Sequence, residues 1–194
     1  GAADTVTAAT GYGRISVDFA DYVITEITCH GRGGRVLAGD ECTVIDVGGQ
    51  DTKVIRIQNG AVTDFLMNDK CSAGTGKFLE IMANRLGIAL DELFELASQE
   101  IGRAHVRISY IGAGKAREDI AAGVVDSVAG KVAQLAQRQN LSGKVILTGG
   151  LSHSEYFASR LTKKLGITVE PTKQGRYAGA LGASYLAEEK AERA

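Results

Sequence analysis

The chain has 194 residues, of which 44 % are hydrophobic and 23 % charged, and its formal net charge is −1. This length suits one large domain or two small ones, and the composition is ordinary for a globular protein. The near-zero charge argues against nucleic acid or a membrane surface as a general partner. The sequence has no 18-residue apolar run and no recognisable signal peptide, which predicts a cytoplasmic location.

The first half of the chain is predicted to form mainly strands. A short strand is expected over residues 5–9, and a helical pattern interrupted by glycines follows over residues 17–37. β-branched and alternating runs then predict three successive strands, the last two joined by a tight turn at Gln58-Asn59-Gly60. These strands are expected over residues 43–49, 52–57 and 61–67.

The second half is predicted to alternate between helices and strands. One helix begins at Phe78, and a short strand and a loop are expected over residues 106–108 and 110–114. Apolar residues recur at helical spacing on one face of the long segment 118–139. The pattern as a whole predicts an α/β protein with a mixed sheet flanked by helices. The remaining elements are helices over 90–99, 154–165 and 177–190 and strands over 144–150 and 167–169.

Glycine is over-used, with 25 glycines against one proline. Glycine lets backbone N–H groups approach a ligand closely, so several glycine-rich turns favour a phosphate-rich ligand held by the backbone. The alternative is that these glycines serve only the turns of an α/β fold. The clusters are Gly48-Gly49, Gly74-x-Gly76, Gly149-Gly150 and Gly179-x-x-Gly182, and for the last one helix packing is the better interpretation.

Residues 46–53 form a candidate phosphate-binding hairpin. Asp46 ends an apolar strand, Gly48 and Gly49 follow it, and Gln50 and Asp51 come next. In such a hairpin, backbone N–H groups can hold phosphates, Asp46 can hold a Mg²⁺-bound water, and Gln50 or Asp51 can orient an attacking water. A plain β-hairpin is the alternative, and a carboxylate at the end of an apolar strand disfavours it.

Cys71 lies in a Gly-rich loop that leads into the helix predicted from Phe78. A helix start carries unpaired N–H groups and partial positive charge, which favour an anion or a thiolate. The loop therefore predicts an iron–sulfur ligand, a phosphate site, or a plain helix start with a buried thiol. Three widely spaced cysteines do not form a disulfide framework, and the three histidines have no metal-ligand partner at i+3 or i+4 and are interpreted as structural or surface residues.

Taken in order, these segments resemble the activators of 2-hydroxyacyl-CoA dehydratases, which belong to the wider family of benzoyl-CoA reductase and dehydratase-activator ATPases. The resemblance extends along nearly the whole chain. It is most specific in the Gly-Gly-Gln-Asp hairpin and in the Asp-Lys-Cys-x-Ala-Gly-Thr-Gly loop. The segments that carry it are residues 10–14, 28–30, 44–51, 68–78, 148–150 and 177–183.

The resemblance implies the acetate/sugar kinase–Hsp70–actin fold, a ribonuclease H-like fold with two lobes and ATP in the cleft between them. It also implies a cytoplasmic homodimer that shares one [4Fe–4S] cluster. ATP hydrolysis would drive a low-potential electron into a partner dehydratase or acyl-CoA reductase. The implied lobes are a partial first lobe over residues 1–42, a second lobe over 43–148, and an adenosine loop with a return to the first lobe over 149–194.

Site residues are carried over one by one from the resemblance. Asp46, Gln50 and Asp51 match the catalytic positions of the second phosphate motif, and Gly48 and Gly49 match its phosphate-binding backbone. Cys71 matches the first cluster cysteine. The adenosine motif is matched by Thr148, Gly149 and Gly150. ATP or ADP, Mg²⁺ and the cluster are the implied cofactors.

The chain departs from the family at two places. The Asp-x-Gly-Ser-Thr first phosphate loop does not precede Thr10, so the fold is expected here without that hairpin. The segment between Ile108 and Lys115 holds no second cluster cysteine. These departures keep two other functions open, a small-molecule kinase of the same fold with a structural Cys71 and a non-catalytic nucleotide-binding module.

Overall fold

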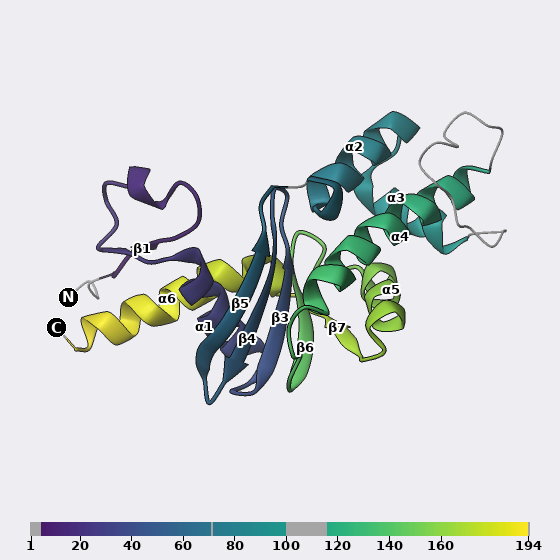
Figure 1. Ribbon diagram of the computed structural model, residues 1–194. Coiled ribbons are helices and arrows are strands. Elements are labelled where there is room, and N and C mark those ends of the chain that lie inside the picture. Colours follow the sequence, from purple (N-terminus) through teal and green to yellow (C-terminus); the bar gives the residue numbers. More distant parts are fainter. Residues whose placement is uncertain (1–4, 71, 100–115, 194) are drawn as a thin grey trace.

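A five-stranded mixed sheet forms the centre of the computed structural model, which describes residues 5–70, 72–99 and 116–193 (Figure 1). The strand order is β5-β4-β3-β6-β7. β3, β4 and β5 pair antiparallel, whereas β6 and β7 run parallel to β3. The strands are β3 (Cys42–Val47), β4 (Thr52–Gln58), β5 (Ala61–Asn68), β6 (Lys144–Gly149) and β7 (Val169–Pro171). The predicted antiparallel strands and the mixed sheet are confirmed.

Helices cover both faces of this sheet (Figure 1). On one face lies α1 (Glu26–Ala38), with α6 (Ala178–Ala191) packed against it. On the other face lie α3 (Leu90–Ser98), α4 (Arg117–Ala136) and α5 (Glu155–Leu165), and α2 (Gly76–Leu86) extends this layer past the strand ends. The apolar stripe predicted for the long helix is buried, as Ile120, Val124 and Val128 show.

Strand alternation divides the core into two clusters. Successive side chains of a strand point to opposite faces, so Val44 and Ile55 face α1 while Ile45 and Val54 face the α4 layer. All six residues of β3 are buried, because this strand is central and covered on both faces. Asp46 has the same parity as Val44, which directs its carboxylate toward α1.

The N-terminal part of the described chain differs from its predicted form. Helix α1 begins at Glu26 rather than near residue 17, and Thr25 is its N-cap, with Oγ1 accepting a hydrogen bond from the Thr28 amide. Before it, β1 (Ala8–Ala9) and β2 (Tyr22–Val23) pair in parallel, with a 3-10 turn η1 (Arg14–Ser16) between them. Local strand propensity could not locate β2, because this two-residue strand depends on pairing with β1, which lies 14 residues earlier in the chain.

The glycines of α1 do not interrupt the helix. Gly33 packs against the carbonyl of Ala178 at the start of α6, and Gly182 of α6 packs against the carbonyl of Cys29. A Cβ at either glycine would lie far inside van der Waals contact with these backbone atoms. The packing role predicted for the Gly179-x-x-Gly182 segment is thus confirmed.

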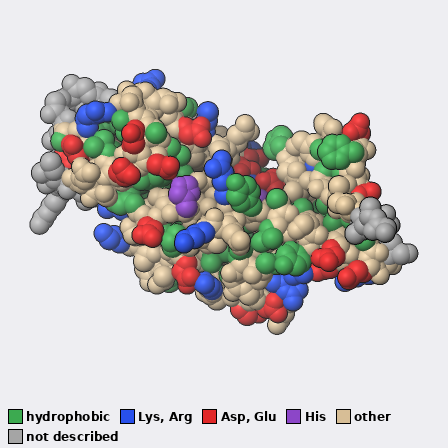
Figure 2. Space-filling view, turned by 180° about the vertical axis from the view of Figure 1, so that it is seen from behind, with side chains coloured by type: hydrophobic (Ala, Val, Ile, Leu, Met, Phe, Trp, Pro, Cys, Tyr) green, Lys and Arg blue, Asp and Glu red, His purple; other side chains and the backbone are tan. Residues whose placement is uncertain are grey.

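Some expectations have a different outcome. β7 covers Val169–Pro171 rather than residues 167–169, and the strand predicted over 106–108 and the loop over 110–114 lie outside the described residues. In the part of the chain that is described, no helix has the length and apolarity needed to cross a membrane. Acidic and basic side chains are interspersed over the face drawn in Figure 2. The lobe boundaries stay a prediction.

Candidate functional site

A cleft of about 370 Å³ opens at the carboxyl ends of β3 and β6. Ligands of α/β sheets bind at this end of the parallel strands, where the loops diverge and leave a crevice. Side chains of α1 and of the strand ends, together with the backbone of the glycine turns, line the cleft. The lining residues are Tyr12, Glu26, His30, Asp46, Gly48, Gly49, Gln50, Asp51, Lys53, Asp69, Gly149, Gly150 and Arg176.

Asp46 lies in the wall of this cleft and is almost completely buried. Its Oδ1 accepts a 2.7 Å hydrogen bond from the hydroxyl of Thr148, because the parallel register of β3 and β6 places these two residues side by side. A buried carboxylate needs partners of this kind to offset its desolvation. Thr148 itself is buried behind Asp46 and does not line the cleft.

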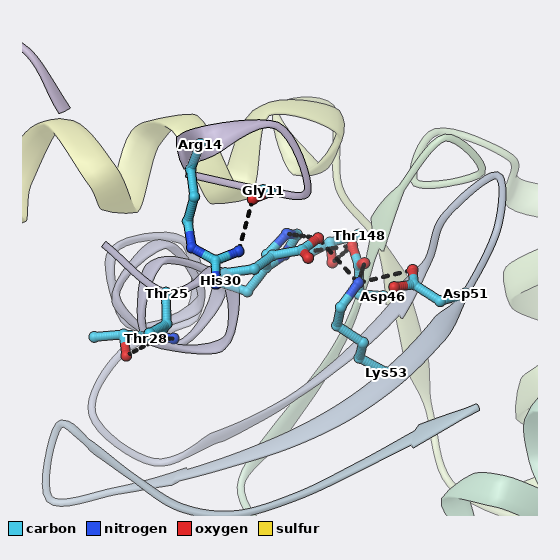
Figure 3. Close-up of polar contacts among 10 residues, drawn as sticks. Gly11, Arg14, Thr25, Thr28, His30, Asp46, Asp51, Lys53 and Thr148 are labelled. Carbon is cyan, nitrogen blue, oxygen red and sulfur yellow. Dashed lines mark hydrogen bonds and ion pairs between the residues drawn. The ribbon is translucent and has the colours of Figure 1, made fainter. Parts of the chain in front are cut away.

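Lys53 is a buried cation among carboxylates (Figure 3). The antiparallel register pairs it with Asp46, so both side chains leave the same face of the sheet. Its Nζ lies 2.7 Å from Asp51 Oδ1, 3.0 Å from Glu26 Oε1 and 3.7 Å from Asp46 Oδ2. Burial lowers the pKa of Lys53, but the neighbouring carboxylates outweigh it and the pKa is raised, which keeps the ammonium charged.

Helix α1 contributes two further side chains, one turn apart. His30 Nε2 lies 3.7 Å from Glu26 Oε1, and His30 Nδ1 lies 3.5 Å from Asp46 Oδ1. The pKa of Glu26 falls to about 2, chiefly because of the neighbouring His30 and with support from Lys53. Burial lowers the pKa of His30, yet Glu26 and Asp46 together raise it above its usual value. The cleft thus contains a network of alternating charges.

Glycines form a further part of the cleft wall. Gly149 has φ +84°, a left-handed conformation that side chains disfavour, and its Cα packs against the Val47 carbonyl and close to Asp46. The Gly150 amide donates to the same carbonyl at 3.1 Å. Backbone at Gly48, Gly49, Gly149 and Gly150 therefore lies within reach of a ligand that enters the cleft.

The hairpin of Gly48 and Gly49 is bonded directly to the start of α2. The amides of Gly76 and Lys77 donate to the carbonyls of Gly48 and Gly49, at 2.9 and 3.1 Å. The buried hydroxyl of Thr52 donates to the Gly74 carbonyl at 2.7 Å. These two amides of α2 are already used, so they are not the free anion-binding donors that the sequence suggested. They fasten the segment after Cys71 to the hairpin.

The other predicted site residues are distributed as follows. Gln50 is exposed at the cleft, and Asp51 is half-buried beside Lys53. Cys71 lies outside the described residues. Cys29 and Cys42 are fully buried in separate apolar clusters, and burial raises their pKa values, to about 11 for Cys42. Among the described residues, no group of three or more His, Cys, Asp or Glu side chains is arranged to hold a metal ion.

Sequence reasoning missed Glu26, His30, Lys53 and Arg176. The sequence predicts His30 to be an isolated structural or surface residue, but its side chain is 13 % exposed and contacts Glu26 and Asp46, so it is neither isolated nor on the surface. The missed signals were the Glu26–His30 spacing of one helical turn and the equal parity of Lys53 with Asp46 across a predicted hairpin. Neither signal shows that α1 packs on the strand ends.

A second, smaller chamber of about 230 Å³ adjoins the cleft and shares Gly48, Gly49, Gly150 and Arg176 with it. Ala89, Leu90 and Leu151 give this chamber an apolar side, and Glu80 and Asp91 give it an acidic one. The two adjoining cavities differ in character. The larger is lined by charged side chains and glycines, and the smaller is mixed in polarity.

Comparison with known proteins assigns the chain to a family. The model of the BadF/BadG/BcrA/BcrD ATPase family matches residues 2–187. The chain belongs to this family. The (R)-2-hydroxyglutaryl-CoA dehydratase activating ATPase of Acidaminococcus fermentans is 40 % identical in an alignment that covers 95 % of this chain and 76 % of that protein.

Solved structures agree with this assignment. The Acidaminococcus fermentans (R)-2-hydroxyglutaryl-CoA dehydratase component A superposes with a TM-score of 0.91 at 39 % identity, covering 96 % of this chain and 77 % of the other. The Clostridium difficile activator of 2-hydroxyisocaproyl-CoA dehydratase, with bound ADPNP, gives 0.89 at 32 % identity, covering 96 % and 74 %. MreB 5 of Spiroplasma citri, at 12 % identity and a TM-score of 0.54, covers 90 % and 62 % and shares the fold. The predicted actin-like ATPase fold is confirmed.

Proposed function

We propose that this protein is an ATP-hydrolysing activator of a 2-hydroxyacyl-CoA dehydratase or a related acyl-CoA reductase, to which it delivers a low-potential electron. The observation that carries the proposal is the hydrogen bonding between the Gly48-Gly49 hairpin and the start of α2. This contact joins a candidate phosphate loop to the segment that follows Cys71. A protein that couples nucleotide chemistry to a thiol-bound centre requires such a connection.

The nucleotide is assigned to the two adjoining cavities. Its phosphates would lie against Gly48, Gly49 and Gly150 in the charged cleft, and its adenosine against Gly149, Gly150 and the apolar side of the smaller chamber. Arg176 lines both cavities and is a candidate contact for the negative charge of the phosphates. The relative with bound ADPNP supports this assignment to a nucleotide site.

Mg²⁺ fits the donors that the cleft offers. Three carboxylates, Glu26, Asp46 and Asp51, surround the single ammonium of Lys53, which leaves an excess of negative charge. Mg²⁺ is commonly held by one or two carboxylates, waters and substrate phosphates rather than by a cage of protein side chains. Asp46 would hold it through water, and the ion would neutralise charge on the phosphates.

Hydrolysis requires a water aligned with the terminal phosphate. Gln50 and Asp51 are the proposed groups, since Gln50 is exposed at the cleft and Asp51 is fixed by its 2.7 Å contact with Lys53. Lys53 neutralises part of the carboxylate charge and so reduces repulsion of the incoming polyphosphate. Phosphoryl transfer depends mainly on such positioning and charge neutralisation.

The thiols of this chain supply only part of a cluster site. Cys29 and Cys42 are buried apart from one another, which leaves Cys71 as the candidate ligand. In a homodimer, two copies of Cys71 give two thiolates, whereas a [4Fe–4S] cluster is usually held by four. The cluster, when bound, would supply the low-potential electron. The proposal assigns Cys71 to it and identifies no residue for the remaining positions.

The test uses the full-length protein purified without oxygen. Three quantities are measured: ATP hydrolysis, iron content with visible absorbance, and activation of a purified dehydratase. Asp51→Asn should lower ATP hydrolysis on the order of 100-fold, whereas the exposed control Asp64→Asn should not change it. Cys71→Ser should keep ATP hydrolysis and lose iron. ATP hydrolysis without any bound iron in the wild type would overturn the electron-transfer part, and absence of hydrolysis would overturn the whole proposal.

A further inference from the structure

The His30 ring connects helix α1 with strand β3. It comes from α1, its Nδ1 lies 3.5 Å from Oδ1 of Asp46 on β3, and its Nε2 lies 3.7 Å from Glu26 Oε1. The side chain is only 13 % exposed. Nδ1 is buried and has no hydrogen-bond partner among the described residues, so Asp46 is the polar group that it faces (Figure 3).

Gly179 forms the other boundary of the ring. A Cβ at this position would lie 2.9 Å from His30 Nε2, which is closer than real Cβ contacts allow. Gly179 is in the first turn of α6, and it does not line the cleft. The absence of a side chain there lets the imidazole lie between α6 and Asp46, and the backbone of α6 limits how far the ring can retreat.

Asp46 is consequently fixed from several directions. Thr148 donates to Oδ1, His30 contacts the same oxygen, and Lys53 faces Oδ2 at 3.7 Å. Thr148 and Lys53 come from neighbouring strands of the sheet that carries Asp46, whereas His30 comes from a helix. Of these three contacts, His30 is therefore the one that links the Asp46 carboxylate to the packed helices α1 and α6.

We propose that His30 is a positioning residue for ATP hydrolysis, which orients the Asp46 carboxylate through Nδ1 and is held in place by Gly179. This inference rests on the proposed ATPase function. Positioning errors of about an ångström can cost on the order of 100-fold in rate. The ring does not need to touch the nucleotide for this role. Its effect would therefore appear in kcat more than in the KM for ATP.

Two amide replacements distinguish the roles of the two ring nitrogens. In His30→Asn the amide nitrogen takes approximately the position of Nδ1, and in His30→Gln it takes that of Nε2. We expect His30→Asn to keep kcat within about threefold of the wild type. His30→Gln, and His30→Ala as a full truncation, should lower kcat about tenfold or more, and the KM for ATP should change less than about threefold in all three variants. The readout is steady-state ATP hydrolysis by the full-length protein with Mg²⁺, together with Tm.

Gly179→Ala tests the same contact without changing His30. Alanine favours a helix over glycine, so α6 itself gains from the change, and the added Cβ displaces the ring. We expect a lower kcat without a matching loss of Tm. Lys144→Ala, which removes an exposed ion pair with Glu170 far from the cleft, is the control and should keep the wild-type kcat.

The outcomes are distinguishable. Wild-type kcat in both His30→Gln and Gly179→Ala would overturn the inference and leave the proposed ATPase intact. Equal losses in His30→Asn and His30→Gln that follow a fall in Tm would also overturn it, since they indicate a structural role. A wild-type protein without ATP hydrolysis would overturn the inference together with the proposed function.

Discussion

Glu26 and Lys53 form an ion pair inside the cleft, with 3.0 Å between the carboxylate oxygen and the ammonium nitrogen. The pair joins the first turn of α1 to strand β4. The Lys53 side chain is 2 % exposed and that of Glu26 is 28 % exposed, so the cation is buried and its partner remains in contact with solvent. Lys53 thus connects the helix to the candidate phosphate-binding hairpin.

Lys53→Met is expected to destabilise the fold by about 2 to 4 kcal/mol, because it leaves Glu26, Asp46 and Asp51 without their common counter-ion. The midpoint of urea unfolding at neutral pH measures the effect. Lys77→Met, which removes a 3.0 Å surface pair with Glu80, is the matched control and should change stability by less than about 0.5 kcal/mol. Equal effects of the two substitutions would contradict the assigned role of Lys53.

Thr148→Val tests the hydrogen bond that Asp46 accepts from the neighbouring strand. Valine has nearly the same shape as threonine but cannot donate the 2.7 Å hydrogen bond to Oδ1. A buried acceptor without its donor costs about 1 to 3 kcal/mol, and ATP hydrolysis should fall with little change in KM, since Thr148 does not line the cleft. Thr148→Ser restores the hydroxyl and should recover most of both losses. A valine variant with unchanged stability and kcat would show that Asp46 does not depend on this bond.

Gly182→Ala tests the close packing of α6 on α1. The added Cβ would run into the carbonyl of Cys29, so the helices must separate, at a cost of about 2 to 3 kcal/mol. Gly130→Ala on α4 is the matched control, because its Cβ would meet nothing closer than Lys164 Nζ at 3.9 Å. The control should stabilise the protein by up to about 1 kcal/mol through helix propensity. Thermal unfolding of the two variants should therefore shift in opposite directions.

Asp126 provides a pH-dependent link between α4 and α5, away from the cleft. Its Oδ2 lies 2.8 Å from Lys164 Nζ, and its Oδ1 lies 3.1 Å from Arg160 Nε. Burial raises the pKa of Asp126, but Lys164 and Arg160 outweigh it and the pKa lies below its ordinary value of 3.8. The resulting stability is present above pH 3.8 and is lost as the pH falls through the lower folded-state pKa.

The corresponding experiment compares the wild type with Asp126→Asn in urea unfolding at several pH values from 7 down to about 3. The variant should be less stable at neutral pH, and the difference between the two proteins should shrink below about pH 4. A difference that stays constant over the whole range would mean that the carboxylate charge contributes nothing to the link.

The sequence by itself determined strands β3 to β6, the glycine turns and the identity of the hairpin residues. β-branched runs with period two end in glycine pairs at residues 48–49 and 149–150, and both signals are local. Asp46 and Asp51 could be predicted as site residues from a local signal too, because a carboxylate at the end of an apolar strand stands out within a few residues of sequence. The long helix could also be predicted, since its buried stripe repeats at helical spacing from Ile120 to Leu135.

Only the tertiary structure decided which charged groups surround Asp46. Glu26 and His30 precede the strands in the chain, and they reach the cleft because α1 packs across the sheet and against α6. That packing depends on Gly33, which in the sequence predicts an interrupted helix, and on Gly182, whose sequence predicts close packing but not its partner. A local pattern records which face of an element is apolar but not which element will cover it. The electrostatic network of this site is therefore a product of packing.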